Sequence, residues 1–143
     1  MSTATELTTA PPLPDPADQM LAGYWEAVAR GELVVQECGS CAAPQWPPRA
    51  GCGKCGLSDL GWRRVAGTGT LFTWTTVHHT TIGYYRPMTP FALAAVELDD
   101  VPVRMLGRVR GTDPDRLTIG MPVQVAFERV SDGVRLPVWE ARS

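Results

Sequence analysis

The chain has 143 residues, enough for one core or for one core with a small metal-held appendage. Hydrophobic residues make up 44% and charged residues 20%, and no apolar run approaches the roughly 20 residues that span a bilayer. The formal net charge of −2 is opposite to the basic excess that nucleic-acid binding normally requires. These values argue against a membrane protein and against a nucleic-acid binder.

The N-terminal segment is predicted to be a disordered tail spanning residues 1–17. Its first residues have neither the positive start nor the apolar stretch of a secretory signal. We therefore expect a cytoplasmic protein with reduced cysteines, which favours metal ligation over disulfides. The segment is rich in Thr, Ala and Pro, and prolines at positions 11, 12, 14 and 16 oppose both a helix and a strand ladder.

A short helix is predicted within residues 18–31. Asp18 is suited to cap its start, and Gly31 is suited to the position just past its end. A helix this short needs tertiary packing to be stable. The self-packing alternative is favoured over docking on a partner subunit, although Tyr24 and Trp25 are candidate partner-surface residues. The predicted apolar face consists of Met20, Leu21, Tyr24, Trp25 and Val28.

Residues 32–60 are predicted to form a zinc ribbon of the rubredoxin-like type. A short strand, Glu32–Glu37, leads into two Cys-x-x-Cys pairs, and the surrounding chain is dense in Gly and Pro with no periodic apolar pattern. Two thiolates three positions apart can converge on one metal ion from a tight turn. The four predicted ligands are Cys38, Cys41, Cys52 and Cys55.

Four thiolates would fill a tetrahedral site and leave no position for water or substrate, so the metal is expected to be structural. Zinc is favoured, and iron, as in rubredoxin, is the metal alternative. Two disulfide-type pairs and a thioredoxin-like redox motif are the remaining alternatives, and the second lacks a surrounding βαβ pattern.

Residues 61–143 are predicted to form a five-stranded Greek-key barrel of the OB type. The strand-like runs are rich in β-branched residues and are separated by turn-forming segments. Gly67-Thr-Gly69 suggests a bulge, and Asp113 with Pro114 suggests a single helical turn between the third and fourth barrel strands. The predicted strands are Trp62–Ala66, Thr70–Thr80, Phe91–Leu98, Val101–Val109, Val123–Val130 and Val134–Trp139.

Candidate catalytic residues are few in the sequence. His78 and His79 are predicted to end a strand and to point to opposite faces, with no carboxylate or nucleophile at a recognisable spacing. Asp99 and Asp100 have the chemistry of a tight hairpin turn. We therefore predict no catalytic residue and lean towards a noncatalytic protein.

Two candidate binding surfaces stand out. The loop from Thr80 to Thr89 is longer than a hairpin needs, and it either forms an interface or folds back over the barrel mouth. Arg104, Arg108 and Arg110 share parity and form either a solvated face or a phosphate-binding one. The candidate ligand or partner residues are Tyr24, Trp25, Arg49, Tyr84, Tyr85 and Arg86.

Over residues 20–140, the order of motifs closely resembles the acyl-CoA-associated zinc-ribbon/OB-fold family long catalogued as domain of unknown function thirty-five. The motifs are Tyr24-Trp25-Glu26, both cysteine pairs, Pro47-Pro48-Arg49, Gly67-Thr-Gly69-Thr70 with Phe72 and Thr73, the run from Pro90 to Leu98, Ile119-Gly-Met121 with Val123, and Leu136-Pro137.

The resemblance implies an accessory subunit beside thiolase-like or MaoC/hotdog hydratase-like enzymes, in a hetero-oligomer that binds acyl-CoA in lipid, steroid or polyketide-type metabolism. The alternatives are an OB-fold protein that binds single-stranded nucleic acid and a stand-alone acyl-CoA enzyme using His78 or His79.

Overall fold

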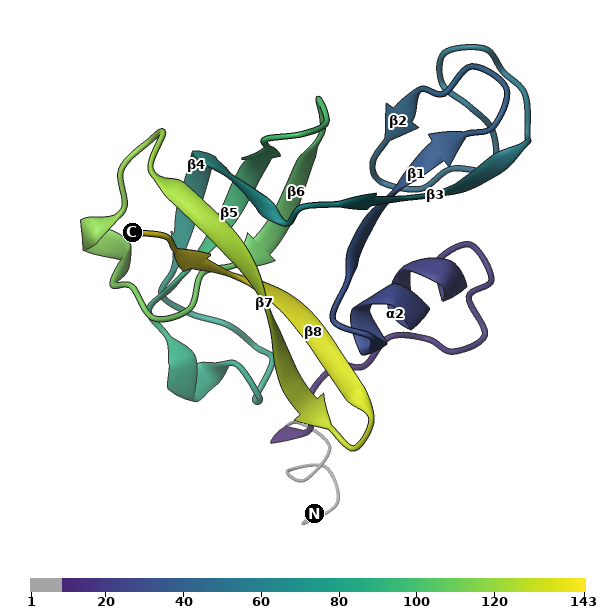
Figure 1. The fold of residues 1–143 in the computed structure, drawn as a ribbon. Coiled ribbons are helices and arrows are strands. Elements are labelled where there is room, and N and C mark those ends of the chain that lie inside the picture. The colour runs from purple at the N-terminus through teal and green to yellow at the C-terminus, as the bar shows by residue number, and fades with distance from the viewer. Residues whose placement is uncertain (1–8) are drawn as a thin grey trace.

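A computed structural model describes residues 9–143 of the chain (Figure 1). Within these residues the fold is mainly β, with a helix, a three-stranded sheet and a five-stranded sheet. The elements in chain order are α2 (Ala22–Ala29), β1 (Leu33–Cys38), β2 (Pro44–Gln45), β3 (Leu60–Val65), β4 (Thr68–Val77), the 3₁₀ turn η1 (Arg86–Met88), β5 (Phe91–Leu98), β6 (Arg104–Arg108), the 3₁₀ turn η2 (Pro114–Arg116), β7 (Pro122–Ser131) and β8 (Val134–Ala141).

Part of the tail predicted for residues 1–17 falls on residues 1–8, which lie outside the described residues. In the part that follows, Pro14, Asp15 and Pro16 line a hollow of about 260 Å³ together with side chains of α2 and of the β7–β8 turn. Residues 14–16 therefore lie against the folded body.

Helix α2 starts later than the sequence predicts, because Asp18 does not cap it. The Asp18 carboxylate accepts the backbone N–H of Met20 at 3.0 Å, which closes a local turn, and Leu21 precedes the helix with no side-chain cap. Gly31 follows the helix with φ +76°, as predicted. The helix contacts β1 and β8, which confirms packing on the protein's own body.

The three-stranded sheet, in the order β2-β1-β3, forms the base of the ribbon. Strand β1 pairs antiparallel with β3 from Leu33 opposite Val65 to Cys38 opposite Leu60. The pattern did not predict β2, because its two residues are too few to show alternation. Since β3 crosses the boundary predicted at residue 60, the ribbon sheet extends to Val65.

The five-stranded sheet, in the order β6-β5-β4-β7-β8, closes into the predicted barrel (Figure 1). Strands β4 and β7 pair near their starts, and β7 and β8 form a long hairpin around Gly133. A parallel bridge joins Val109, just after β6, to Trp139 of β8, and the N–H of Arg110 donates to the Trp139 carbonyl at 2.8 Å. This bridge closes the five-strand order of an OB fold.

Two local predictions in the barrel are wrong. The register shift of β4 lies between Leu71 and Thr73, not at Gly67-Thr-Gly69, where a Cβ on Gly69 would come within 2.4 Å of the Glu97 carbonyl oxygen. Glycine is needed there for close strand approach, not for a bulge.

The turn after β5 is also longer than the predicted hairpin. The Asp100 carboxylate accepts the N–H of Ala66 at 2.9 Å, and Val103 donates to the carbonyl of Val101, so β6 begins at Arg104. The helical turn capped by Asp113 is confirmed, because its carboxylate accepts the N–H of Asp115 at 2.9 Å.

One hydrophobic core joins the helix, the base of the ribbon and the barrel. Its fully buried members come from α2, from the start of β1 and from every barrel strand, and include Val28, Val35, Leu71, Val96 and Val123. The burial stabilises the fold by about 1.5–3 kcal/mol for each large apolar side chain. None of the helices in residues 9–143 has the length and apolar character needed to cross a membrane.

Candidate metal centre and neighbouring surfaces

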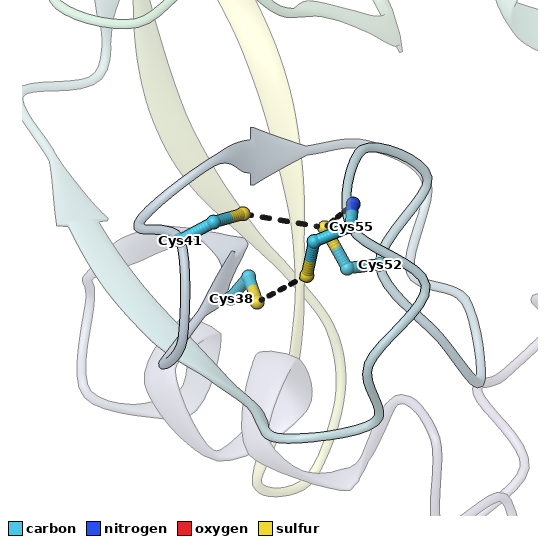
Figure 2. Close-up of side chains that lie close together, drawn as sticks. All are labelled: Cys38, Cys41, Cys52 and Cys55. Carbon is cyan, nitrogen blue, oxygen red and sulfur yellow. Dashed lines mark hydrogen bonds between the residues drawn. The ribbon is translucent and has the colours of Figure 1, made fainter.

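The four cysteines converge at the far end of the ribbon, as Figure 2 shows. Cys38 ends β1 and Cys41 lies in the turn that follows, whereas Cys52 and Cys55 lie in the loop before β3. All four sulfur atoms are within 4.8 Å of one another. The Sγ atoms of Cys38 and Cys55 are 3.6 Å apart, as are those of Cys41 and Cys52.

Each pair forms a tight turn whose backbone N–H groups point at a sulfur atom. Ser40 donates to the Cys38 Sγ at 3.4 Å, and Lys54 and Cys55 donate to the Cys52 Sγ at 3.3 and 3.4 Å. The N–H groups of Cys55 and Lys54 lower the pKa of the Cys52 thiol to about 6. Hydrogen bonds from the backbone of Cys41 and Ser40 likewise lower the pKa of Cys38. These N–H groups thus favour the thiolate, the form that binds metal, at Cys38 and Cys52, whereas burial and the neighbouring thiols raise the pKa of Cys55.

The spacing of the sulfur atoms fits a metal and does not fit disulfides. A disulfide needs a sulfur–sulfur distance of about 2.05 Å, and the four cysteines are free thiols. A tetrahedron of roughly 2.3 Å metal–sulfur bonds sets neighbouring sulfurs about 3.8 Å apart. The observed 3.6 Å separations match that tetrahedron, so the four cysteines are suited to metal binding.

A buried glutamine holds the loop that carries Arg49. Gln36 of β1 is 5% exposed, and its amide accepts the N–H of Arg49 at 2.9 Å and donates to the Arg49 carbonyl at 3.0 Å. Gln45 donates to the same Gln36 oxygen at 2.6 Å and accepts the N–H of Gly53 at 3.0 Å. The backbone of Arg49 and the second cysteine turn are therefore fixed relative to β1.

The predicted aromatic residues of the helix join α2 to the ribbon. The Tyr24 ring stacks on Trp25 with centroids 4.9 Å apart and meets the edge of Trp46 at 4.8 Å. Tyr24 is buried, which raises the pKa of its phenol above the usual value. Trp25 is half-buried and lines the hollow beside Pro14 and Arg135. Tyr24 therefore packs inside the chain, and Trp25 remains partly accessible.

The loop after β4 folds partly back on the barrel. Tyr85 packs at 5.9 Å from the Phe91 ring and at 5.0 Å from Tyr84, and both tyrosines are half-buried. Arg86 is exposed, and its guanidinium donates to the carbonyls of Thr80 and Thr81. The predicted loop residues thus come together, with Tyr85 on the wall of a hollow of about 340 Å³ and Arg86 at the surface.

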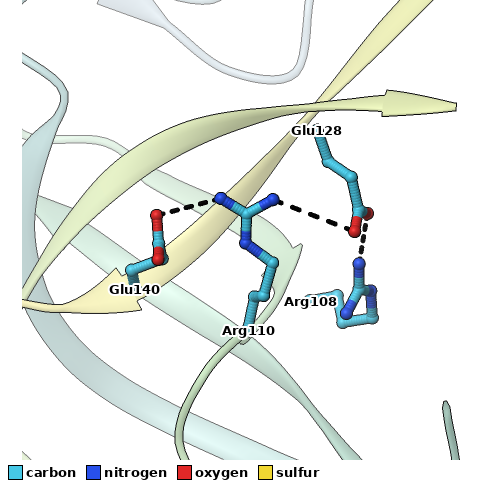
Figure 3. A network of polar contacts seen from close by, with 4 residues as sticks. All are labelled: Arg108, Arg110, Glu128 and Glu140. Carbon is cyan, nitrogen blue, oxygen red and sulfur yellow. Dashed lines mark hydrogen bonds and ion pairs between the residues drawn. The ribbon is translucent and has the colours of Figure 1, made fainter.

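The arginine row predicted along the third barrel strand is divided by ion pairs (Figure 3). Arg108 pairs with Glu128, and Arg110 bridges Glu128 at 3.9 Å and Glu140 at 3.1 Å. Arg104 instead pairs with Glu97 at 3.3 Å and covers the Phe72 ring at 3.6 Å. A phosphate at this row would have to displace carboxylates. His78 and His79 lie just past β4 and are both exposed.

Sequence comparison finds both parts of the chain in known families. Residues 25–61 match the family described as "ChsH2, rubredoxin-like zinc ribbon domain", and residues 62–128 match "ChsH2, C-terminal OB-fold domain". The chain is 32% identical over 127 residues to the "Probable enoyl-CoA hydratase alpha subunit" of Thermomonospora curvata, covering 88% of this chain and 39% of that protein.

Two further curated relatives show the same pattern. The chain is 34% identical to the "3-oxo-4,17-pregnadiene-20-carboxyl-CoA hydratase alpha subunit" of Mycobacterium tuberculosis, over 82% of this chain and 36% of that protein. It is 26% identical to the "DUF35 domain-containing scaffold protein" of Methanocaldococcus jannaschii, over 80% of this chain and 82% of that one. The chain thus spans less than two fifths of each hydratase subunit.

Two solved structures share the fold. A chain of the "Ltp2-ChsH2(DUF35) aldolase" superposes with a TM-score of 0.81 at 29% identity, covering 90% of this chain and 98% of that chain. A protein of unknown function from the DUF35 family of Sulfolobus solfataricus superposes with a TM-score of 0.59 at 10% identity, covering 87% of each chain, which supports the fold alone.

Sequence reasoning missed Gln36 and the cleft between the ribbon and the barrel. Gln36 ends the apolar run of residues 33–35 in β1 and is still buried, and its place beside that run was the available signal. The cleft unites residues 41–54 with residues 97–104, and no spacing in the sequence shows that these segments meet.

Proposed function

Because the chain belongs to the DUF35 family of zinc-ribbon/OB-fold proteins, we propose that it is an accessory subunit that binds acyl-CoA and supports a partner enzyme. The observation that carries the proposal is the match to the aldolase-complex chain, which extends over nearly all of both chains. The hydratase alpha subunits among its relatives point to the same kind of assembly. The partner is a hydratase-like or a thiolase/aldolase-like enzyme in lipid, steroid or polyketide-type metabolism.

The proposed metal is one zinc ion held by Cys38, Cys41, Cys52 and Cys55. Zinc suits a closed set of four thiolates and supplies structural crosslinking, not Lewis-acid chemistry, when bound in this way. Support comes from the sulfur spacing, from the backbone N–H groups that favour thiolates, and from the match to a zinc-ribbon family. Metal analysis of the purified chain separates zinc from iron. Reduced cysteines also favour the proposed cytoplasmic location.

The chain's own residues supply binding surfaces in this proposal. Trp25 and the loop with Tyr84, Tyr85 and Arg86 keep aromatic or cationic groups accessible, and such groups are enriched at interfaces. The hollow beside Tyr85 is lined mainly by apolar side chains, with the Arg108–Glu128 pair in its wall. Reaction chemistry is assigned to the partner.

Co-expression of the chain with candidate thiolase-like and hydratase-like partner proteins tests the proposal. Native mass spectrometry is expected to show a hetero-oligomer that contains this chain. Trp25→Ala and Arg86→Ala probe the accessible surfaces, and Arg142→Ala is a matched surface control near the C-terminus. A chain that stays alone with every candidate partner would contradict the proposal.

A further inference from the structure

A cleft separates the ribbon from the barrel. It consists of two adjoining hollows of about 590 and 500 Å³, whose linings share Pro44, Gln45, Arg49 and Pro102. The first hollow continues along the ribbon to Cys41, Gly53 and Lys54. The second continues along the barrel to Glu97, Val103 and Arg104. The two parts of the fold therefore form opposite walls of one continuous cleft.

The ribbon wall carries two cations without acidic partners. Arg49 and Lys54 both line the first hollow, and the described residues contribute no carboxylate to that lining. Neither side chain forms an ion pair with another residue of the 9–143 range, whereas Arg104, Arg108 and Arg110 of the barrel are paired with glutamates. This hollow is thus a positively charged part of a protein whose net charge is −2.

Arg49 is positioned by the fold without help from an acid. Gln36 fixes its backbone through two hydrogen bonds, and Gln36 is itself buried in the sheet. A Cβ on Gly53 would lie 2.6 Å from an Arg49 guanidinium nitrogen, so the missing side chain at Gly53 leaves room for the guanidinium. Fixing the backbone that carries a cation lowers part of the entropic cost of holding an anion.

The barrel wall adds a third cation, Arg104, which has an acidic partner. The guanidinium of Arg104 pairs with Glu97 and lies 3.6 Å above the Phe72 ring. It closes the cleft opposite Arg49 with its charge partly balanced. The strongest anion position is therefore on the ribbon wall, at Arg49 and Lys54.

We propose that Arg49 and Lys54 bind the phosphate groups at the nucleotide end of a CoA thioester. This inference rests on the proposed acyl-CoA function and assigns it a site. The 3′-phosphate and the diphosphate of CoA are the acceptor-rich anions that guanidinium and ammonium groups recognise. With the nucleotide end in the cleft, the thioester arm is free to extend towards a partner's active site.

Isothermal titration calorimetry with CoA, 3′-phospho-ADP and pantetheine tests the site. The zinc-loaded chain is expected to bind CoA and 3′-phospho-ADP, with affinity that falls as salt rises, and not to bind pantetheine. Arg49→Gln and Lys54→Gln each lower the CoA affinity by about tenfold or more, because each removes a charged hydrogen-bond donor. Arg116→Gln, a matched exposed arginine away from the cleft, leaves the affinity unchanged.

Zinc content and a thymidine oligonucleotide complete the test. Arg49 is not adjacent to a cysteine, so the Arg49→Gln variant is expected to keep its zinc. If the Lys54→Gln variant loses zinc, the CoA affinity of Arg49→Gln alone decides the result. CoA binding that is unchanged in Arg49→Gln would overturn the cleft assignment and leave the accessory function standing. A wild-type chain that joins its partner enzyme but binds no CoA would overturn both the site and acyl-CoA binding. Tighter binding of the oligonucleotide than of CoA would also overturn the assignment.

Discussion

The ribbon and the barrel are stabilised in different ways within one chain. Every barrel strand contributes fully buried apolar side chains to the core, including Leu71, Val96 and Val123. Residues 36–64, which form most of the ribbon, contribute no fully buried side chain to that core. Trp46 is partly buried and packs against the core from outside. The ribbon tip therefore depends on its four cysteines and on the hydrogen bonds of Gln36 and Gln45.

This difference explains how a small protein can offer a cleft between two bodies. The barrel strands supply most of the shared core, and the ribbon tip lies outside that core, so the tip can present Arg49 and Lys54 without burying them. The Tyr24–Trp46 contact joins the ribbon to helix α2, and the buried residues at the start of β1 join the ribbon sheet to the core of the barrel.

Metal removal should produce the largest difference in stability between the ribbon and the barrel. Structural zinc contributes on the order of 10 kcal/mol to a ribbon, so a chelator is expected to unfold residues 38–59 and to leave the barrel folded. Hydrogen exchange followed by mass spectrometry should show lost protection at the ribbon tip and retained protection in β5. Cys52→Ser should give the same pattern without chelator. Simultaneous loss of protection in β5 would mean that the barrel depends on the metal.

A cavity in the barrel should destabilise the barrel and leave the metal site of the ribbon intact. Leu71 is 1% exposed, so Leu71→Ala is expected to lower the free energy of unfolding by about 2–5 kcal/mol while the zinc content stays the same. Urea denaturation of the zinc-loaded protein measures the change. Leu106→Ala is the matched control, because Leu106 is 72% exposed and its loss should cost less than about 0.5 kcal/mol. Equal effects at the two sites would contradict the assigned core.

Loss of the hydrogen bonds of Gln36 should lower the stability by a smaller amount. Gln36→Leu leaves the N–H and carbonyl of Arg49 and the amide of Gln45 without their partner, which is expected to cost about 1–3 kcal/mol. Gln124→Leu makes the same change on an exposed strand position and should be nearly neutral. Urea midpoints of the two variants provide the measurement. An unchanged urea midpoint in Gln36→Leu would show that the hydrogen bonds of Gln36 do not hold the loop that carries Arg49.

Alkaline pH should reveal the buried contact of helix and ribbon. Burial raises the pKa of Tyr24, so the unfolded phenol ionises first, near pH 10, while the folded phenol stays neutral. Its contribution is complete below pH 10 and is lost above it, by at most about 1.4 kcal/mol per pH unit. Urea midpoints between pH 8 and 11 should fall less in Tyr24→Phe than in wild type. A pH slope in Tyr24→Phe identical to that of the wild type would contradict the assignment.

Local patterns predicted much of this fold. The cysteine spacing identified the metal-type cluster, and alternation over Phe91–Leu98 gave the bounds of β5 as the structure has them. Asp113 and Pro114 located the turn after the third barrel strand for the same local reason. In each case the residues that determine the structure are close in sequence.

The failures have a common physical cause, which is competition from contacts that the sequence pattern does not show. The Asp18 carboxylate accepts the backbone N–H of Met20 instead of capping the helix. The Asp100 carboxylate accepts the N–H of Ala66, and β6 therefore begins later than predicted. Arg104, Arg108 and Arg110 have the spacing of one strand face, but glutamates from other strands pair with all three. The cleft depends on how the ribbon sits against the barrel, which only tertiary structure reveals.

Acyl-CoA turnover by the reconstituted complex tests the central claim most directly. The purified chain is added back to the partner enzyme, and turnover is measured for the partner alone, the chain alone and the two together. An accessory subunit predicts that turnover requires or is redirected by the chain, and that the chain alone is inactive. Unchanged turnover without the chain, or turnover by the chain alone that a His78→Ala or His79→Ala substitution abolishes, would contradict the account.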